Sequence, residues 1–399
     1  MKITTGLFSV LAFLISLHVQ GQDLTENTFG KGLVNVVAKD SSYSANFSLR
    51  MQSLFTSGWD ISEDDGFGDA EANFLVRRAR LKFQGFAYTP KLTYKLELGL
   101  SNRDISGASV YNGDTPRYIL DAVVKWNFYE NFELWAGQTK LPGNRERLIS
   151  SGNLETVDRS LVNSRFNIDR DMGIQLHHEI FPGGDFIIRE AISIAQGEGR
   201  NVTAGNLGGL QYTGRLELLP FGDFADYTGA DFARETTPKL ALGISYDYNN
   251  NAVRTRSNSG TYMLNDDGFF ETDITTLFVD AMFKYRGISA MAEYAHRAAD
   301  EALARNTDDT LTGDAVNTGS GFNVQAGYLF KNNIQILGRY TTIDLDDQVT
   351  QLVENQYTLG LSKYIVKHKL KVQTDFNYTD LNLGLDDNLT YRLQFELHL

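Results

Sequence analysis

Apolar and polar residues alternate without a break at the end of the chain. The apolar positions are Leu389, Tyr391, Leu393, Phe395, Leu397 and Leu399, and the polar positions between them are Asn388, Thr390, Arg392, Gln394, Glu396 and His398. Successive side chains of a β-strand point to opposite faces, so the pattern predicts a strand with one apolar face and one wet face. A strand of a soluble β-sandwich shows the same alternation, and this segment alone leaves the fold open.

The period of two recurs along the chain. Clear examples are residues 43–52, 92–100, 121–128 and 370–378. Such segments predict about 16 strands of about ten residues, an even number and a length typical of a bacterial outer-membrane β-barrel. The predicted strands lie near residues 43–55, 74–88, 92–101, 118–128, 132–140, 170–180, 184–196, 209–219, 239–248, 273–285, 287–297, 320–330, 332–342, 355–366, 368–380 and 388–399.

The connections between these segments are of two kinds. Short turns are predicted at residues 89–91, 129–131, 182–184, 286–287, 331–332 and 367–368, and long polar loops at 56–73, 102–117, 141–169, 249–272, 298–319, 343–354 and 381–387. Short turns at one rim and long loops at the other are typical of an outer-membrane barrel. We therefore expect an all-β, antiparallel transmembrane barrel over residues 43–399, wide enough to hold a water-filled channel.

The chain begins with the features of an export signal. Lys2 supplies a positive charge, an apolar run covers residues 7–17, and Val19 and Gly21 have the small side chains that precede a cleavage site. The alternative is a membrane anchor, but the run is too short to span a bilayer comfortably. We predict a signal peptide at residues 1–21, a periplasmic segment at residues 22–42 and a location in the outer membrane.

Composition removes several classes of function. The chain has no cysteine, which excludes disulfides and thiolate metal sites, and its net charge of −13 argues against a nucleic-acid binder. There is no phosphate loop, dinucleotide fingerprint or paired-histidine metal motif, so no cofactor and no metal are predicted. An acidic chain can still form an anion pore, because its loops and its lumen can carry opposite charges.

The polar face of the predicted strands carries a row of cations. Arg78, Arg80 and Lys82 share one face at two-residue steps of roughly 6.5–7 Å, and Lys95 and Lys125 point inward from later strands. Such a row offers an anion successive sites, each weak enough to leave. The alternative is that these cations only balance inward carboxylates, which are Glu97, Asp121, Asp171, Glu217, Asp280, Glu293, Asp375 and Glu396.

The loop at residues 141–169 is the second candidate for the anion path. It carries Arg145, Arg147, Arg159 and Arg165, with Arg170 at its end. Apolar residues such as Leu154, Val157 and Phe166 predict a packed loop. In a wide barrel this loop would fold inward and place its arginines at the narrowest point. The alternative is an extracellular loop with ordinary charges.

Four segments together resemble a known family. They are Phe74–Leu81, which reads FLVRRARL, Gly137–Pro142, Asp158–Leu161 and Arg170–Ile174. In this order they resemble the phosphate-selective porins O and P, and Phe29–Leu33 is similar to members from Bacteroidetes-type bacteria. The resemblance implies a sixteen-stranded, trimeric pore with inward loops and an arginine-rich anion path. The chain departs from the family in its acidic composition and in ending with Leu399 instead of an aromatic residue.

We predict a passive porin for small anions, with phosphate as the candidate solute, embedded in lipid and lipopolysaccharide as a homotrimer. A general or sugar-permeable porin is one alternative, although only Trp59, Trp126 and Trp135 could offer tryptophan rings to a sugar. The other is a plugged structural barrel or a barrel enzyme, for which His177 is the best candidate base. No serine motif accompanies His177, so no catalytic residue is predicted.

Overall fold

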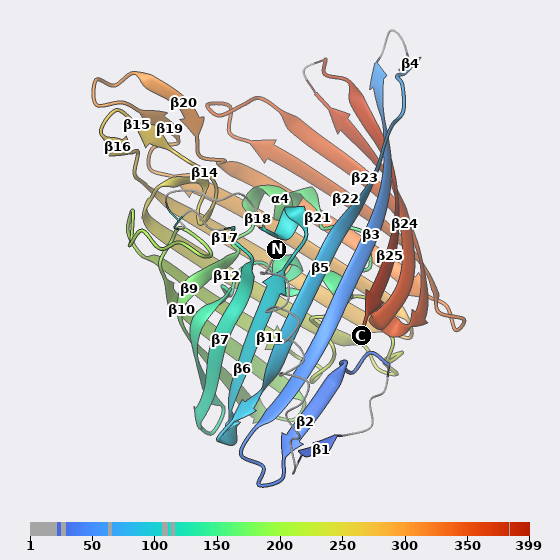
Figure 1. The fold of residues 1–399 in the computed structure, drawn as a ribbon. Coiled ribbons are helices and arrows are strands. Elements are labelled where there is room, and N and C mark those ends of the chain that lie inside the picture. The colour runs from blue at the N-terminus through green and yellow to red at the C-terminus, as the bar shows by residue number, and fades with distance from the viewer. Residues whose placement is uncertain are drawn as a thin grey trace, which may run out of the picture.

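Sixteen antiparallel strands form a closed barrel (Figure 1). The computed structural model describes residues 22–24, 29–62, 66–105, 111, 113, 116–382 and 384–399, so the predicted signal peptide lies outside the described residues. The barrel strands are β3 (Ser44–Ser62), β5 (Glu71–Ala87), β6 (Thr89–Gly99), β7 (Ile119–Tyr129), β8 (Phe132–Lys140), β9 (Arg170–Gly183), β10 (Phe186–Ala195), β11 (Gln211–Leu219), β12 (Lys239–Ala252), β17 (Thr272–Tyr285), β18 (Ile288–Ala299), β21 (Gly319–Leu329), β22 (Ile334–Leu345), β23 (Val353–Val366), β24 (Leu370–Leu381) and β25 (Asp387–His398). Each predicted segment overlaps one of them, which confirms the predicted barrel.

The last strand closes the barrel on the first. β25 pairs with β3 from Asp387 opposite Ile61 to His398 opposite Arg50. Within β25 the side chain of Phe395 is 56% exposed to the outside, while Glu396 beside it is only 1% exposed in the lumen. The alternation that predicted the strand is thus the alternation between lipid and lumen.

Short strands lie at the two rims of the barrel. β1 (Gln22–Leu24) and β2 (Val34–Ala38) continue the sheet at the lower rim, where β2 pairs with the start of β3. At the upper rim lie the paired strands β13 (Arg254–Arg256) and β14 (Ser259–Tyr262), β15 (Leu264–Asn265) and β16 (Gly268–Phe269), and β19 (Leu303–Arg305) and β20 (Leu311–Ala315), together with β4 (Gly66–Phe67). Among the described residues no helix is long and apolar enough to cross a membrane.

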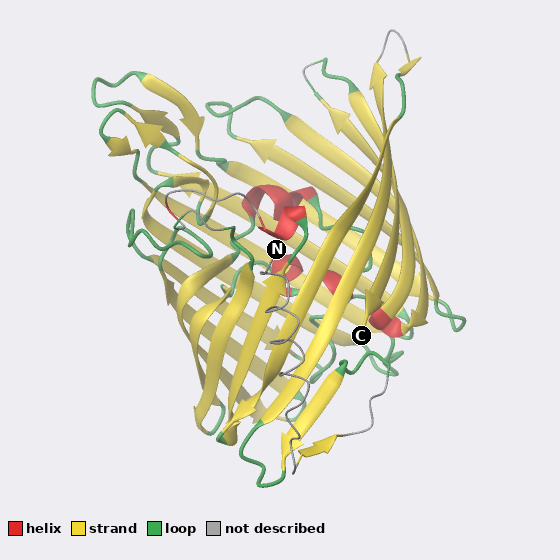
Figure 2. Ribbon diagram, viewed as in Figure 1, coloured by secondary structure: helices red, strands yellow, loops and turns green. Residues whose placement is uncertain are grey.

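The loop at residues 141–169 folds into the barrel, as predicted. It forms α3 (Arg145–Leu148), η2 (Ser151–Asn153) and α4 (Leu161–Phe166), which lie inside the ring of strands (Figure 2). The hydroxyl of Ser160 accepts a hydrogen bond from the N–H of Asn163 and caps α4. The remaining helical turns are α2 (Asn102–Ile105), between β6 and β7, and η3 (Lys367–Lys369), between β23 and β24.

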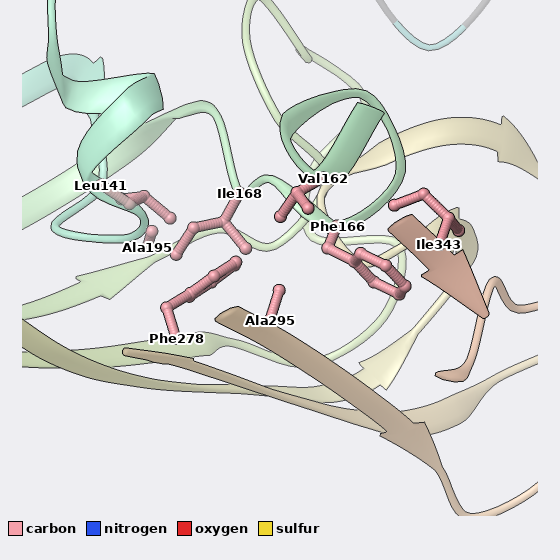
Figure 3. Close-up of a cluster of buried hydrophobic side chains, with 8 residues drawn as sticks. All are labelled: Leu141, Val162, Phe166, Ile168, Ala195, Phe278, Ala295 and Ile343. Atoms are coloured by element: carbon pink, nitrogen blue, oxygen red, sulfur yellow. The ribbon is translucent and has the colours of Figure 1, made fainter. Parts of the chain in front are cut away.

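Apolar contacts fix this loop to one side of the lumen. Val162, Phe166 and Ile168 of the loop are fully buried. They form a cluster with Phe278, Ala295 and Ile343 from β17, β18 and β22 (Figure 3). A second buried cluster joins Ile149 and Leu154 of the loop to lumen residues such as Leu219 and Met282. These apolar patches give the loop a defined seat, because burying them removes apolar surface from water.

One connection at the lower rim is long. Residues 220–238 join β11 to β12 at the rim that otherwise carries short turns. The predicted strands leave this gap open, but neither the predicted short turns nor the predicted long loops include it. The segment turns inward: the ring of Phe232 packs edge-on against Tyr364 at 4.9 Å, and Arg234 donates to the carbonyl of Leu329 at 2.9 Å. It therefore covers part of the lower opening of the barrel.

Candidate functional site

A cavity of about 980 Å³ runs between the inward loop 141–169 and the barrel wall. Its wall includes Arg80 of β5, Lys95 of β6, Lys125 of β7, Trp135 of β8, His177 of β9, Arg189 of β10 and Glu217 of β11. The loop is seated on β17, β18 and β22, at the other side of the barrel. The cavity is therefore eccentric, and it is bounded by both candidates from the sequence, the cationic row and the arginine-bearing loop.

A β-bulge turns two adjacent arginines into this cavity. In the pairing of β3 with β5, Gln52 lies opposite Arg78 while Ser53 lies opposite Val76, so Arg77 has no partner. An extra residue interrupts the alternation of faces. Arg77 and Arg78 consequently both line the cavity, although strict alternation would send Arg77 outward.

Asp158 of the inward loop joins both of these arginines. Its carboxylate lies 2.7 Å from Nη2 of Arg77 and 3.3 Å from Nη2 of Arg78. Burial would raise the pKa of Asp158, but Arg78 and Arg77 lower it far below its usual value. Asp158 is therefore ionised throughout the physiological range and neutralises part of the row.

The middle of the row alternates in charge. Arg80 contacts Asp104 at 2.6 Å and Glu97 at 3.2 Å. Lys95 bridges Glu97 and Asp121, both at 2.9 Å. Arg170 then contacts Asp121 at 3.1 Å, which places it in the same chain of ion pairs. The predicted residues Arg78, Arg80, Lys95 and Arg170 are thus brought together, each beside a carboxylate.

Three other cations of the cavity have no carboxylate within ion-pair distance among the described residues. Lys125 lies 3.2 Å above the ring of Trp135. Lys140 donates to the carbonyls of residues 147–149 at 2.6 to 3.3 Å. Arg159 donates to the carbonyls of Glu146 and Ile149, and burial together with Arg147 lowers its pKa to about 9. Positive charge is crowded around Lys140 and Arg159, because Arg147 lies near both of them.

Four predicted residues have other surroundings. Arg147 lines the cavity but forms an ion pair with Asp169. Arg145 is fully buried and does not line the cavity itself, although its partners Glu217 and Asp226 do. Arg165 pairs with Glu354 of β23. Lys82 lines a separate cavity of about 450 Å³, where the other basic residues are Lys31, Lys369 and His398. Arg145 therefore acts as an anchor of the loop.

Sequence reasoning missed a cluster of arginines near the upper rim. A second cavity, of about 460 Å³, is lined by Arg117, Arg170, Arg200, Arg254 and Arg256, and Asp169 is the one acidic residue among its lining residues. Arg117 and Arg200 lie on loops, and Arg254 and Arg256 form the short strand β13 inside the long polar segment 249–272. No pattern in the sequence marks the direction of these four side chains. Arg103, Lys140 and Arg189 of the main cavity were missed as well.

The cavity is basic although the chain is acidic. Thirteen Lys and Arg line the main cavity against nine Asp and Glu, while the chain as a whole carries −13. The acidic residues are thus concentrated elsewhere. Like-charged walls in a confined lumen raise the local concentration of the opposite ion.

His177 has no catalytic partner among the described residues. Its ring stacks on Trp135 at 4.0 Å, and its Nε2 lies 3.0 Å from the amide oxygen of Gln175. Asp171, which the sequence placed on the same face, accepts backbone N–H groups of Gly197 and Gly199. Among the described residues no group of three or more His, Asp or Glu is arranged to hold a metal ion.

Comparison with known proteins agrees with this geometry. The family of phosphate-selective porins O and P matches residues 48–383. The chain belongs to this family. It is therefore an outer-membrane porin, as the resemblance implied, and porins are channels and not enzymes.

Solved structures share the fold of this porin at low sequence identity. A loop-deletion mutant of OmpT from Vibrio cholerae superposes with a TM-score of 0.52 at 12% identity and covers 89% of this chain and 99% of that chain. An anion-selective porin from Comamonas acidovorans gives 0.51 at 12% identity, covering 89% and 100%. The channel DcaP of Acinetobacter baumannii gives 0.50 at 15% identity, covering 88% and 97%. A protein of Aquifex aeolicus (strain VF5) described as uncharacterized is 24% identical over 355 residues, which are 81% of this chain and 79% of that protein.

Proposed function

We propose that this porin conducts small anions by passive diffusion, with phosphate among the solutes that it binds. The observation that carries the proposal is the basic wall of the main cavity, where Lys125, Lys140 and Arg159 have no carboxylate within ion-pair distance among the described residues. A charge-assisted bond to an anion is available at Lys125 and Arg159. The three N–H groups of Lys140 already donate to backbone carbonyls, so Lys140 contributes through its charge alone. The family's description as phosphate-selective and the description of the Comamonas acidovorans porin as anion-selective support the same preference.

Single-channel currents in a planar bilayer test this proposal. Under a chloride gradient we expect a reversal potential of anionic sign and a block of the current by added phosphate. Lys125→Gln should weaken the block, and Lys331→Gln, in an exposed turn at the lower rim, is the matched control that should leave it unchanged. A cationic reversal potential in the unmodified protein would refute the anion path.

Arg80 gives a second, stronger test. Arg80→Ala removes one cation and leaves Asp104 without its ion-pair partner, while Glu97 keeps Lys95 at 2.9 Å. The wall then loses one positive charge and exposes the unpaired carboxylate of Asp104, so the chloride-to-potassium permeability ratio should fall further than in Lys125→Gln. Equal ratios in the two variants would mean that the ion-paired row lies outside the conducting path.

A general porin without phosphate selectivity is the second candidate. The alternation of Arg80, Glu97, Lys95 and Asp121 favours it, because paired charges offer an anion little net field. Large currents that phosphate does not block would support it. A sugar path is less compatible, since the ring of Trp135 is already in contact with Lys125 from β7 and His177 from β9. Folded protein without any current would instead indicate a plugged barrel.

We also propose how the mature protein is made and assembled. Cleavage before Gln22 would leave residues 22–42 in the periplasm and the barrel in contact with lipid and lipopolysaccharide as a homotrimer. A structure of OmpT from Vibrio cholerae described as a trimer form has the same fold and supports the assembly. Mass spectrometry of the protein purified from outer membranes would identify the first residue, and light scattering in detergent would give the number of subunits.

A further inference from the structure

Arg200 lies where the two arginine-lined cavities meet. It is a lining residue of both the cavity of about 980 Å³ and the cavity of about 460 Å³. Its Nη2 donates to the carbonyl of Asp104, and its Nη1 is buried without a hydrogen-bond partner among the described residues. A solute that passes from the upper cavity to the lower one would pass the side chain of Arg200.

Arg200 is carried by loop 196–210, between β10 and β11, and Asp171 of β9 fastens the start of this loop. Oδ2 of Asp171 accepts hydrogen bonds from the backbone N–H groups of Gly197 and Gly199, both at 3.0 Å. Gly197 lies three residues and Gly199 one residue before Arg200, so the carboxylate of Asp171 holds the backbone that carries the arginine. Asp171 is 1% exposed and has no ion pair among the described residues.

Glu198 fastens the other end of the same loop. Its Oε1 accepts hydrogen bonds from the N–H groups of Leu207 and Gly208, both at 3.1 Å. Its Oε2 is buried and has no partner among the described residues. A carboxylate with one bonded and one bare oxygen in a buried position is the arrangement expected of the protonated acid, because an ionised group there would lack solvation.

The charged groups around Glu198 favour the protonated form. Asp171 faces it from β9, and Tyr262 faces it from β14. Arg254 of β13 is the nearest cation, but it donates to the backbone carbonyl of Glu198 at 2.5 Å and not to the carboxylate. Burial, and then the charge of Asp171, raise the pKa of Glu198 to about 7.

We propose that Arg200 is a selectivity residue at the junction of the two cavities, held in place by Asp171 and by protonated Glu198, so that anion preference decreases as the pH rises through neutrality. The inference rests on the proposed anion path. Ionisation of Glu198 places a second negative charge beside Asp171. Because the buried carboxylate of Glu198 is then poorly solvated, loop 196–210 loosens and water reaches this carboxylate. Arg200 then leaves the junction, and the new negative charge acts against anions in the same place.

The test is the chloride-to-potassium permeability ratio of the full-length porin at about pH 6 and about pH 8, from reversal potentials in planar bilayers. A change of one charge on the wall of the path changes the chloride-to-potassium permeability ratio by roughly threefold in moderate salt. We therefore expect a threefold decrease in the unmodified protein at the higher pH. Glu198→Gln, which keeps the acceptor oxygen and cannot ionise, should give the high ratio at both pH values. Arg200→Gln should lower the ratio already at about pH 6 and leave only the smaller further decrease that the charge of Glu198 causes.

Two exposed residues provide the controls. Glu271→Gln and Arg286→Gln make the same chemical changes outside the cavities and should titrate like the unmodified protein. An anion-selective channel whose ratio does not change with pH would overturn this inference and leave the proposed function standing. A Glu198→Gln channel that still titrates would also overturn it. A channel without anion preference at either pH would instead refute the proposed function.

Discussion

Arg145 attaches loop 141–169 to three separate elements through ion pairs. Its guanidinium lies 2.6 Å from Glu217 on β11, 2.9 Å from Asp226 in segment 220–238 and 2.6 Å from Asp280 on β17. The side chain is 0% exposed, and each of the three carboxylates is buried as well. Removing one member of a buried ion pair costs about 3–5 kcal/mol, because its partners keep their charge without solvation.

We therefore expect Arg145→Leu to release the inward loop. The variant should unfold at a lower temperature and should give larger and noisier single-channel currents, because the loop no longer keeps its seat beside the cavity. Both quantities can be followed in detergent and in planar bilayers. Arg165→Leu is the matched control, since Arg165 is half exposed and pairs with Glu354 alone. If the two variants behaved alike, Arg145 would not be the anchor of the loop.

Among the strands, alternation decided what the sequence could predict. Each barrel strand has a lipid face and a lumen face. The alternation of apolar and polar residues therefore predicts where the strand lies and to which face each side chain points. The bulge at Arg77 escaped this reasoning, because an extra residue is visible only against its partner strand. Arg254 and Arg256 of the upper cavity lie on β13, which is only three residues long and too short to show a period that fixes the side-chain direction. The inward fold of loop 141–169 was predictable because the loop carries its own apolar residues.

Segment 220–238 is the element whose removal should widen the pore. Asp226 and Tyr227 of this segment line the main cavity. Leu218 pairs directly with Leu242, so β11 and β12 can be joined by a tight hairpin turn without this segment. Replacing residues 222–237 by a short Gly–Ser turn should keep the barrel and raise the single-channel conductance. Shortening the β19–β20 hairpin at residues 307–309 is the control for loop length, and a conductance that rose equally there would point to a general loosening.

For the molecule as a whole, the separation of charge sets how selectivity depends on salt. The chain carries −13, yet the lining of the main cavity has an excess of four cations, thirteen against nine. Selectivity of this origin acts through the field of the wall and not through a dehydrated binding site.

The Debye length falls from about 10 Å at 0.1 M salt to about 3 Å at 1 M, which is shorter than the reach of such a field across a lumen. The chloride-to-potassium permeability ratio should therefore fall towards unity between these two concentrations, whereas block by phosphate at Lys125 or Arg159, being a contact interaction, should weaken much less. Measuring both quantities on the same channels separates the two contributions. A ratio that is independent of salt would place the selectivity in a contact site, and Arg200, with its unpaired donor at the junction of the cavities, would then be the first residue to change.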